Sequence, residues 1–490
     1  MSLISILQFL AYAFIFFVGA IFLAIIVTYI VDKTQTKQTI RRNYPVIGHF
    51  RYFFEHVGTF LRQYFFAMDR EELPFNRAER SWVYRAAKNI DSTVAFGSTR
   101  NIYQTGTVFF ANSMYPSLAN DNEDISVTFG PQTKNPFSTN SFFNISAMSY
   151  GALSTPAVRA LSHGAKKAGI WLNTGEGGVS PFHLESGCAV IFQIGTAKFG
   201  VRDKAGNLCP ERLKEVASKE QIKMFEIKLS QGAKAGKGGI LPGAKVNEEI
   251  AGIRGIEIGQ DAISPNRHPE IESGADLLKM INQVRDISEK PVGIKFCAGD
   301  FGEFEELCQL IKNTGAEQAP DFITIDGSSG GTGAAPQSLI DNVGLPLRES
   351  LPRVIDLLEQ YGLRERIKVI SSAKLITPAE VAWAMAIGAD AVNNARGFMF
   401  SLGCIQALQC NKNTCPTGIT THNKKLQKGL DPTNKAERVA HYAKNMMKEV
   451  NIIANSCGVT HARKLERKHL RIVNDHGHSQ GFTEFYKDAV

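Results

Sequence analysis

Eight short apolar runs that alternate with helical patterns restrict the possible folds of this chain more than any other feature. Nearly every run ends in small or polar residues. The runs lie at 142–148, 170–175, 190–197, 224–230, 292–299, 322–328, 368–374 and 391–397. Helical patterns at 273–287, 302–314, 349–361 and 378–387 separate several of them. Strands separated by helices predict a parallel sheet, and eight is the number that closes a (β/α)8 barrel.

The predicted fold class is therefore α/β, a (β/α)8 TIM barrel preceded by one transmembrane helix. An open doubly wound sheet is the alternative that periodicity alone leaves open. In a closed barrel the chemistry lies at the C-terminal ends of the strands. A polar stretch at 134–141 is expected to lead into the first strand, and a helix, a basic stretch and a polar tail are expected after about residue 430.

The segment 3–31 contains no charged side chain and is longer than the roughly 20 residues that a helix needs to cross a bilayer. Its uncharged start and its length favour a retained anchor over a cleaved signal peptide or a buried helix. Much of the net charge of +8 follows directly after it. The cations there are Lys33, Lys37, Arg41, Arg42, Arg51 and Arg62, against Asp32 and Glu55. Cations on this side predict a single-pass membrane protein with a cytoplasmic catalytic domain.

Four regions follow from these patterns: an anchor at 1–32, a basic and aromatic juxtamembrane region at 33–95, the barrel at 96–440 and a C-terminal helix with a basic tail at 441–490. Residues 50–66 combine aromatic side chains with arginine. They fit a helix that lies on the lipid headgroups and equally an aromatic packing helix. No zinc-finger spacing or RNA-binding aromatic signature is present, so no nucleic-acid partner is expected.

Three of the eight cysteines, Cys404, Cys410 and Cys415, crowd into one short stretch. Thiolates favour iron–sulfur or zinc sites, but the spacing differs from the close pairs of structural zinc sites. Three cysteines can hold the three irons of a [3Fe–4S] cluster, and Pro416 follows the last one, as a proline often does in cluster-binding loops. Three unrelated thiols are the alternative that spacing leaves open.

Three glycine-rich segments follow predicted strands. The loop 327–333 can cradle anionic oxygens with its hydroxyl and backbone N–H groups, although such loops also occur as plain turns. The segment 173–178 frames Glu176, whose carboxylate can bind or exchange protons, or can cap a helix N-terminus. The segment 231–239, with Arg254 downstream, suits a dianionic substrate or is a solvated basic loop.

Lys295 lies inside the apolar run at 292–299. A lysine that points into a barrel needs an anionic partner, and a flavin edge that gains negative charge on reduction would supply one. An outward lysine that snorkels is the alternative. Barrels commonly bind cofactor phosphate at the ends of the last two strands. The residues there are Ser371, Ser372, Lys374, Arg396 and Gly397.

Taken together and in this order, the motifs resemble the FMN-binding domain of glutamate synthase from about residue 146 to 423. The resemblance rests on SAMSYGALS, NTGEGG, KLSQGAKAGKGGILPGAKV, SSGGTGAAP and LGCIQALQCNKNTCPTGI. It implies a barrel that carries FMN and a [3Fe–4S] cluster, with Cys404, Cys410 and Cys415 as the cluster ligands.

The resemblance also implies residue roles. The catalytic residues would be Glu176, Gln231 and Lys234, with Glu176 the candidate for proton handling. Arg254 would bind a carboxylate of 2-oxoglutarate together with Lys234. The cofactor-binding residues would be Ser149, Lys295, Ser328, Gly330, Gly331, Ser372, Lys374, Arg396 and Gly397.

The implied reaction is reductive. Ammonia and 2-oxoglutarate would give 2-iminoglutarate, and hydride would reach the imine carbon from N5 of reduced FMN, which the cluster supplies with electrons. A separate donor is expected: ferredoxin, an NAD(P)H-dependent flavoprotein or a membrane quinol. Neither an N-terminal glutaminase domain nor a C-terminal β-helix domain is expected, so ammonia would come from solution or a partner.

The segment 394–399, NARGFM, departs from the usual family sequence, and the chain is more similar to short, stand-alone members. Two other functions therefore stay open: an FMN and iron–sulfur oxidoreductase for another 2-oxo acid or amine, and a membrane electron-transfer or assembly subunit.

Overall fold

A closed barrel of eight parallel strands forms the centre of the computed structural model, which describes residues 3–119 and 123–487. The strands follow one another around the barrel in chain order. They are β4 (Phe143–Ile145), β5 (Leu172–Asn173), β6 (Val190–Ile194), β7 (Ile222–Lys228), β10 (Val292–Phe296), β11 (Phe322–Asp326), β12 (Lys368–Ser372) and β13 (Ala391–Asn394). Each coincides with a predicted run, so the TIM barrel is confirmed and the open sheet is excluded.

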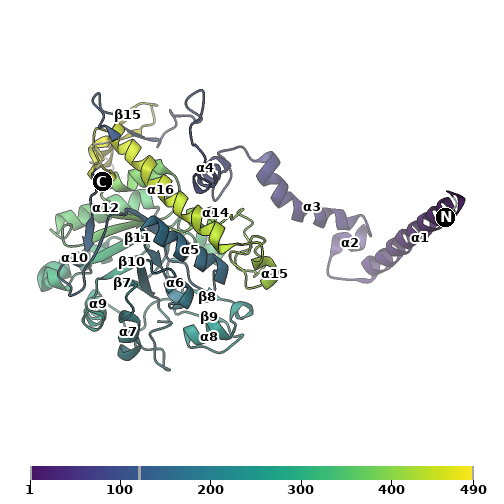
Figure 1. Ribbon diagram of the computed structural model, residues 1–490, viewed down its shortest axis with the longest axis horizontal. Helices are drawn as coiled ribbons and strands as arrows, with labels where there is room; N and C mark the ends of the chain where they lie inside the picture. Colours follow the sequence, from purple (N-terminus) through teal and green to yellow (C-terminus); the bar gives the residue numbers. More distant parts are fainter. Residues whose placement is uncertain (1–2, 120–122, 488–490) are drawn as a thin grey trace. The chain divides into compact units, whose positions relative to one another are not determined.

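Helices surround the barrel (Figure 1). The main ones are α5 (Thr155–Ala168), α7 (Pro210–Ala217), α9 (Gly274–Ser288), α10 (Gly302–Thr314), α12 (Leu347–Gln360), α13 (Pro378–Ile387) and α16 (Pro432–Ser456). Although α5 and α16 are far apart in the sequence, they lie side by side (Figure 1). Gly164 permits this packing, because a Cβ atom there would lie 2.4 Å from Cγ1 of Val439.

A hairpin of β2 (Val127–Phe129) and β3 (Phe137–Thr139) packs against the core of the barrel. The ring of Phe129 meets those of Trp171 and Phe322 edge to face, at centroid distances of 5.7 and 5.8 Å. Phe137 also packs against Trp171. The stretch 134–141 leads directly into the first barrel strand, as predicted, and the aromatic contacts of Phe137 with distant strands accompany a short strand, β3, within it.

Two segments differ from expectation. The last strand was predicted at 391–397, but β13 ends at Asn394 and α14 (Arg396–Ser401) begins two residues later. The C-terminal region, expected to be a polar tail, contains β14 (Leu470–Val473), which pairs with β1 (Val108–Phe110) and β15 (Ser479–Gly481). The α17 helix (Phe482–Lys487) follows. The pairing partner β1 lies more than three hundred residues earlier, so local sequence could not indicate this sheet.

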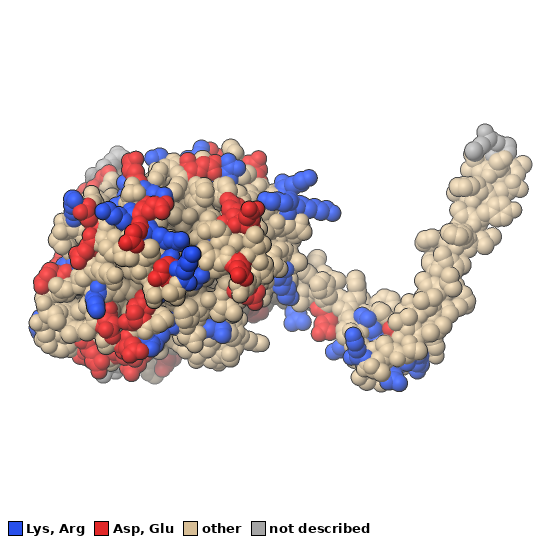
Figure 2. All heavy atoms as spheres, turned by 90° about the horizontal axis from the view of Figure 1, so that it is seen from below, with Lys and Arg blue, Asp and Glu red and all other residues tan. Residues whose placement is uncertain are grey.

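The chain divides after residue 78 into two compact units. The first contains α1 (Leu3–Thr34), α2 (Thr39–Asn43), α3 (Gly48–Leu61) and a π-helical turn, η1 (Arg62–Phe66). Among the described residues, α1 is the one helix long and apolar enough to cross a membrane. In Figure 2 its surface is tan along its length, with blue side chains gathered beyond its end. At a rise of about 1.5 Å per residue it exceeds the roughly 30 Å of a hydrocarbon core.

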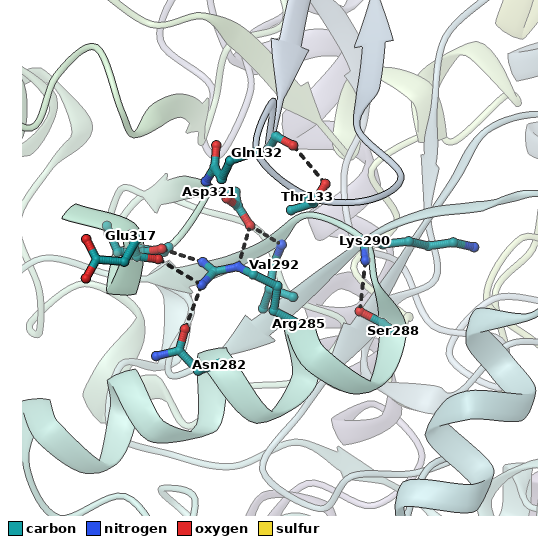
Figure 3. A network of polar contacts seen from close by, with 12 residues as sticks. Gln132, Thr133, Asn282, Arg285, Ser288, Lys290, Val292, Glu317 and Asp321 are labelled. Atoms are coloured by element: carbon teal, nitrogen blue, oxygen red, sulfur yellow. Dashed lines mark hydrogen bonds and ion pairs between the residues drawn. The ribbon is translucent and has the colours of Figure 1, made fainter. Parts of the chain in front are cut away.

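The residue that precedes β11, Asp321, is fully buried and organises the polar network in Figure 3. Its carboxylate accepts hydrogen bonds from Nε of Arg285 at 3.1 Å, Nε2 of Gln132 at 2.8 Å and the backbone N–H of Val292 at 2.8 Å. Arg366 adds an ion pair at 3.0 Å. Since these groups come from separate elements, the network ties together the N-terminal end of the barrel.

Candidate active site

A long excursion between β7 and α9 carries much of the predicted site. It contains the 3-10 turns η4 (Gly232–Lys234) and η5 (Gly243–Lys245), the hairpin of β8 (Ile240–Leu241) and β9 (Ala262–Ile263), and α8 (Glu248–Arg254). Because it starts at the C-terminal end of a barrel strand, it lies at the end of the barrel where such folds place their chemistry.

Glu176 stands on the 3-10 turn η3 (Gly175–Gly177), directly after β5. Its Oε2 lies 3.0 Å from Nζ of Lys228, the last residue of β7. The excursion approaches the carboxylate so closely that a Cβ atom at Gly239 would lie 2.2 Å from Oε1. A Cβ at Gly195 would lie 2.6 Å from Cβ of Glu176. Glycines at these positions therefore leave the space that this carboxylate occupies.

Three buried cations, Lys228, Lys234 and Arg254, surround Glu176. Burial raises the pKa of the Glu176 carboxyl, but the three cations outweigh burial, so that the pKa lies below its ordinary value. Burial, with Lys228 nearby, lowers the pKa of Lys234 to about 8. The predicted alternative of a solvated basic loop is thus wrong for Lys234, whose side chain is removed from solvent.

Arg254 is held by its surroundings as well as by charge. Its guanidinium donates to the carbonyl of Tyr150 at 3.2 Å and lies 5.1 Å from the ring centre of Phe199. Burial lowers its pKa to about 10, so it stays a cation at neutral pH. Its Nε is buried without a hydrogen-bond partner among the described residues. A buried donor of this kind suits the carboxylate of a ligand.

Gln231 connects the cations to the glycine-rich loop after β11. Its Oε1 accepts a hydrogen bond from Nζ of Lys228 at 2.6 Å, and its Nε2 donates to the carbonyl of Gly331 at 3.1 Å. The predicted residues Glu176, Gln231, Lys234 and Arg254 therefore belong to one connected group, although they come from three separate segments.

Lys295 is buried on β10 and faces Asp326, with Nζ 3.4 Å from Oδ2. Burial lowers the pKa of Lys295, but Asp326 and Glu226 outweigh burial and raise it. Glu226 itself accepts hydrogen bonds from the side chains of Asn173, Gln193 and Thr324, at 2.9, 2.7 and 2.6 Å. Lys295 thus points inward, and the alternative of an outward lysine is wrong.

Cations also gather where a cofactor phosphate was predicted. Burial lowers the pKa of Arg396 to about 10, and burial together with Arg396 lowers that of Lys374. Arg396 donates to the carbonyl of Ser329 at 2.7 Å, and a Cβ at Gly331 would lie 2.9 Å from its Nε. On neighbouring β12, the Ser371 hydroxyl is buried without a partner among the described residues. Two half-buried cations near a glycine loop suit a phosphate group.

The other predicted cofactor residues lie on the same segments. Ser328 belongs to the glycine-rich loop, and its backbone N–H donates to Leu345. Ser149 backs the turn that carries Glu176, since a Cβ at Gly175 would lie 2.5 Å from its backbone N. Close packing explains why residue 397 is a glycine, because a Cβ atom there would lie 2.1 Å from the Tyr442 hydroxyl. The roles of these residues toward a cofactor stay predictions.

The three cysteines of the loop 404–415 lie near one another. Burial raises the pKa of Cys404 to about 12, and the thiols of Cys410 and Cys415 add to this rise. Burial also raises the pKa of Cys415, but hydrogen bonds from the side chains and backbone of Thr417 and Thr420 outweigh burial and lower it. Lys245, from the excursion, donates to the carbonyls of Cys410 and Thr420 at 2.8 and 2.7 Å.

Within the described part of the chain, no three His, Cys, Asp or Glu side chains are arranged to hold a single metal ion. The assignment of Cys404, Cys410 and Cys415 as ligands of a [3Fe–4S] cluster stays a prediction.

Sequence reasoning missed four residues of this site: Lys228, Glu226, Asp326 and Lys245. A signal was present for Lys228, which interrupts an apolar run just as Lys295 does. Asp326 also ends an apolar strand. Lys245 had no such signal, because its partners are backbone carbonyls of a loop more than one hundred and sixty residues away.

The model of the conserved region in glutamate synthase matches residues 105–460. The chain belongs to the glutamate synthase family. A glutamate synthase large subunit-like protein, YerD, of Bacillus subtilis is 41% identical over 498 residues, which cover 93% of this chain and 94% of the relative. Glutamate synthases are oxidoreductases acting on CH–NH2 donors, and the chain is an enzyme of this class.

More distant family members share the barrel region. An archaeal glutamate synthase [NADPH] of Methanocaldococcus jannaschii is 35% identical over 323 residues, which cover 66% of this chain. The match spans only 60% of that relative. A solved structure of mandelate oxidase superimposes with a TM-score of 0.46 and 13% identity, over 81% of this chain and 98% of that one.

Proposed function

We propose that this member of the glutamate synthase family forms glutamate reductively from 2-oxoglutarate and ammonia, by way of 2-iminoglutarate, with FMN and a [3Fe–4S] cluster as cofactors. The observation that carries the proposal is the group of three buried cations around Glu176 at the barrel mouth. A substrate with two carboxylates needs cations held in fixed places. The archaeal and archaeal-type relatives are named glutamate synthases, which supports glutamate as the product.

The reaction joins ammonium and 2-oxoglutarate with the loss of water, and two electrons and two protons then give glutamate. FMN, when bound, would supply the hydride for the imine carbon, and the cluster would supply the electrons. Lys234 and Arg254 would hold the carboxylates and so orient the imine. Glu176, which its neighbours keep ionised, would accept the proton that ammonium loses as its nitrogen attacks the keto carbon.

The chain's own residues fit both cofactors. Lys295 would face the flavin edge, and Lys374 and Arg396 with the glycine-rich loop would hold the phosphate. Cys404, Cys410 and Cys415 would hold the cluster. The mutual proximity of the three thiols supports this assignment, because burial raises the pKa of Cys404 and both Cys410 and Cys415 raise it further.

Helix α1 would anchor the protein in the membrane as a single span, with the catalytic domain in the cytoplasm. Its described side chains from residue 3 to 31 face outward almost without exception, as expected of a helix surrounded by lipid. Lys33 and the cations that follow would lie on the cytoplasmic side. A cleaved signal sequence would leave no such helix in the mature protein, which intact-mass measurement of membrane fractions would reveal.

Electrons would enter beside Cys404. A cavity of about 230 Å³ is lined there by Tyr84, Lys88, Gly403 and Arg438, among others. The Tyr84 hydroxyl donates to the carbonyl of Cys404 at 2.6 Å, so the cavity borders the cysteine loop. Its cations would attract an acidic electron carrier such as a ferredoxin.

The proposed electron-entry surface around this cavity can be tested by reversing the charges of its two cations. Replacing Lys88 and Arg438 by Glu should lower kcat/KM for an acidic ferredoxin by about tenfold or more at low salt. Turnover with a small uncharged dye should stay unchanged. Lys204→Glu, at an exposed turn elsewhere, is the control. An equal loss with the dye would contradict the assignment of this surface.

Purified protein tests the reaction directly. We expect a yellow-brown spectrum that bleaches on reduction, release of FMN on denaturation, and glutamate formed from 2-oxoglutarate and ammonium with a reduced dye as donor. Glutamate formation from another 2-oxo acid alone would favour the first alternative function. No amino acid product, together with rapid oxidation of the dye by quinone, would favour the electron-transfer subunit.

A further inference from the structure

One side of α3 and η1 is an aromatic face whose side chains are exposed. Its members include residues three or four positions apart (50, 53 and 54, then 60 and 64), the spacing that places side chains on one side of a helix. They are Phe50, Phe53, Phe54, Phe60 and Tyr64, which are 60%, 57%, 60%, 38% and 57% exposed. An exposed apolar face of this size marks an interaction surface.

Cations border this aromatic face. Arg51 and Arg62 lie on the same helical segment as the face, and Arg41 and Arg42 lie on α2. The guanidinium groups of Arg41 and Arg51 stand 4.9 and 5.5 Å from the ring centre of Tyr52. Figure 2 shows blue side chains gathered beyond the end of the tan N-terminal helix. A unit that carries both cations and exposed aromatic rings fits the surface of an anionic bilayer, where headgroups meet acyl chains.

The start of α3 is fastened to the end of α1. Asp32, on the last turn of α1, is 2% exposed and accepts hydrogen bonds from the backbone N–H of Val46 at 2.9 Å and from Nε2 of His49 at 2.9 Å. Val46 adopts φ +65°, a conformation that β-branched residues rarely take. We call these hydrogen bonds of Asp32 the clamp. The clamp holds the first residues of α3 next to the end of the uncharged segment of α1.

We propose that α3 and η1 lie on the surface of the membrane that α1 enters, with the aromatic face in the acyl boundary and the four arginines among anionic headgroups. The inference rests on the proposed membrane anchor. We take an anionic lipid bilayer as the partner of the aromatic face for two reasons. The clamp joins the face to the end of the spanning segment, and the four arginines outnumber the one acid of α3 and η1, Glu55.

The test uses the full-length protein at one copy per nanodisc, in phosphatidylcholine alone or mixed with phosphatidylglycerol. Trypsin cleavage after Arg51 and Arg62 is measured, with cleavage after the exposed Lys204 as internal reference. We expect anionic discs to slow cleavage at both arginines by about tenfold or more relative to detergent, since several large apolar side chains become buried. Phosphatidylcholine discs should protect less.

Two variants sharpen the result. Phe53→Ser with Phe54→Ser should restore cleavage in anionic discs, whereas Ile258→Ser, at an exposed apolar residue of the catalytic unit, should not. Equal cleavage in discs and detergent would overturn the inference.

Protection only at two copies per disc would also overturn it, because a second copy of the protein would then cover the aromatic face. Extraction of the protein from vesicles by alkaline carbonate would overturn the anchor itself, and the inference with it.

Discussion

Charge around a single carboxylate dominates this site at the residue scale. Glu176 faces Lys228 directly, and Lys234 and Arg254 add to its stabilisation as an anion. An ionised carboxylate accepts protons and cannot donate one. Its proposed role in proton handling is therefore limited to that of a base, and it also holds the cations in place before the substrate arrives.

Lys228 is expected to be a positioning residue for 2-oxoglutarate. Lys228→Met removes its ion pair with Glu176 and its hydrogen bond to Gln231, so kcat/KM for 2-oxoglutarate should fall by about a hundredfold while FMN content stays unchanged. Lys228→Arg should recover part of the activity. The control is Lys219→Gln, at a half-buried lysine that pairs with the exposed Glu215. Wild-type kinetics for Lys228→Met would refute the role.

Lys234 should give substrate binding a pH dependence. Burial lowers its pKa to about 8, so the cation that would hold a carboxylate is lost as pH rises through that value. The KM for 2-oxoglutarate should then rise by up to about tenfold per pH unit above this pKa, with little change in kcat. Steady-state kinetics from pH 7 to 9.5 measure this dependence. Lys234→Arg should flatten the rise, because arginine stays protonated; an unchanged rise in this variant would assign the titration to another group.

At the scale of elements, the loop 404–415 is shaped by its backbone. Three residues that are not glycine adopt left-handed conformations within it: Gln406 at φ +56°, Leu408 at +54° and Asn413 at +59°. Such conformations persist only where surrounding contacts hold them. Lys245 and Thr421 supply contacts of this kind, since both donate hydrogen bonds to the loop backbone.

Cys410→Ser tests whether this loop holds a cluster. Loss of one of the three expected ligands should lower the bound iron and abolish the electron paramagnetic resonance signal of an oxidised [3Fe–4S] cluster. Iron analysis and the spectrum of the purified protein measure this. Cys209→Ser, at a cysteine far along the chain from the loop, should keep both. Unchanged iron in Cys410→Ser would show that the cluster assignment is wrong.

For the molecule as a whole, β11 links stability at one end of the barrel with chemistry at the other. Asp321 directly precedes the strand and ties two arginines to the barrel, whereas Asp326 ends the strand and pairs with Lys295. This division matches the general separation of stability and catalysis between the two ends of such barrels.

Asp321→Asn should destabilise the catalytic unit without altering the site. It leaves Arg285 and Arg366 without their anion, and breaking a buried ion pair costs about 3–5 kcal/mol. Guanidinium or thermal unfolding in detergent measures the loss. Lys167→Gln breaks an exposed pair with Glu437 and should cost about 0–1 kcal/mol. Equal stability of the two variants would contradict the importance of this network.

The positions of the barrel strands could be read from the sequence because each is a local apolar run with a polar end. The site could be predicted where a motif is local, as for Glu176 in its glycine turn or the three neighbouring cysteines. The link from Gln231 to Gly331 and the contact of Gly239 with Glu176 could not, because these residues meet only after the barrel has closed.

The sequence by itself therefore determined the barrel, the uncharged N-terminal segment and the types of residue at the mouth, since periodicity and composition act over short stretches of chain. Only the tertiary structure decided which charges face one another. It paired Lys228 with Glu176, turned Lys295 inward to Asp326 and fastened Asp32 to His49. Burial and distance fix the energies of such pairs, and both depend on segments that the chain brings together from far apart.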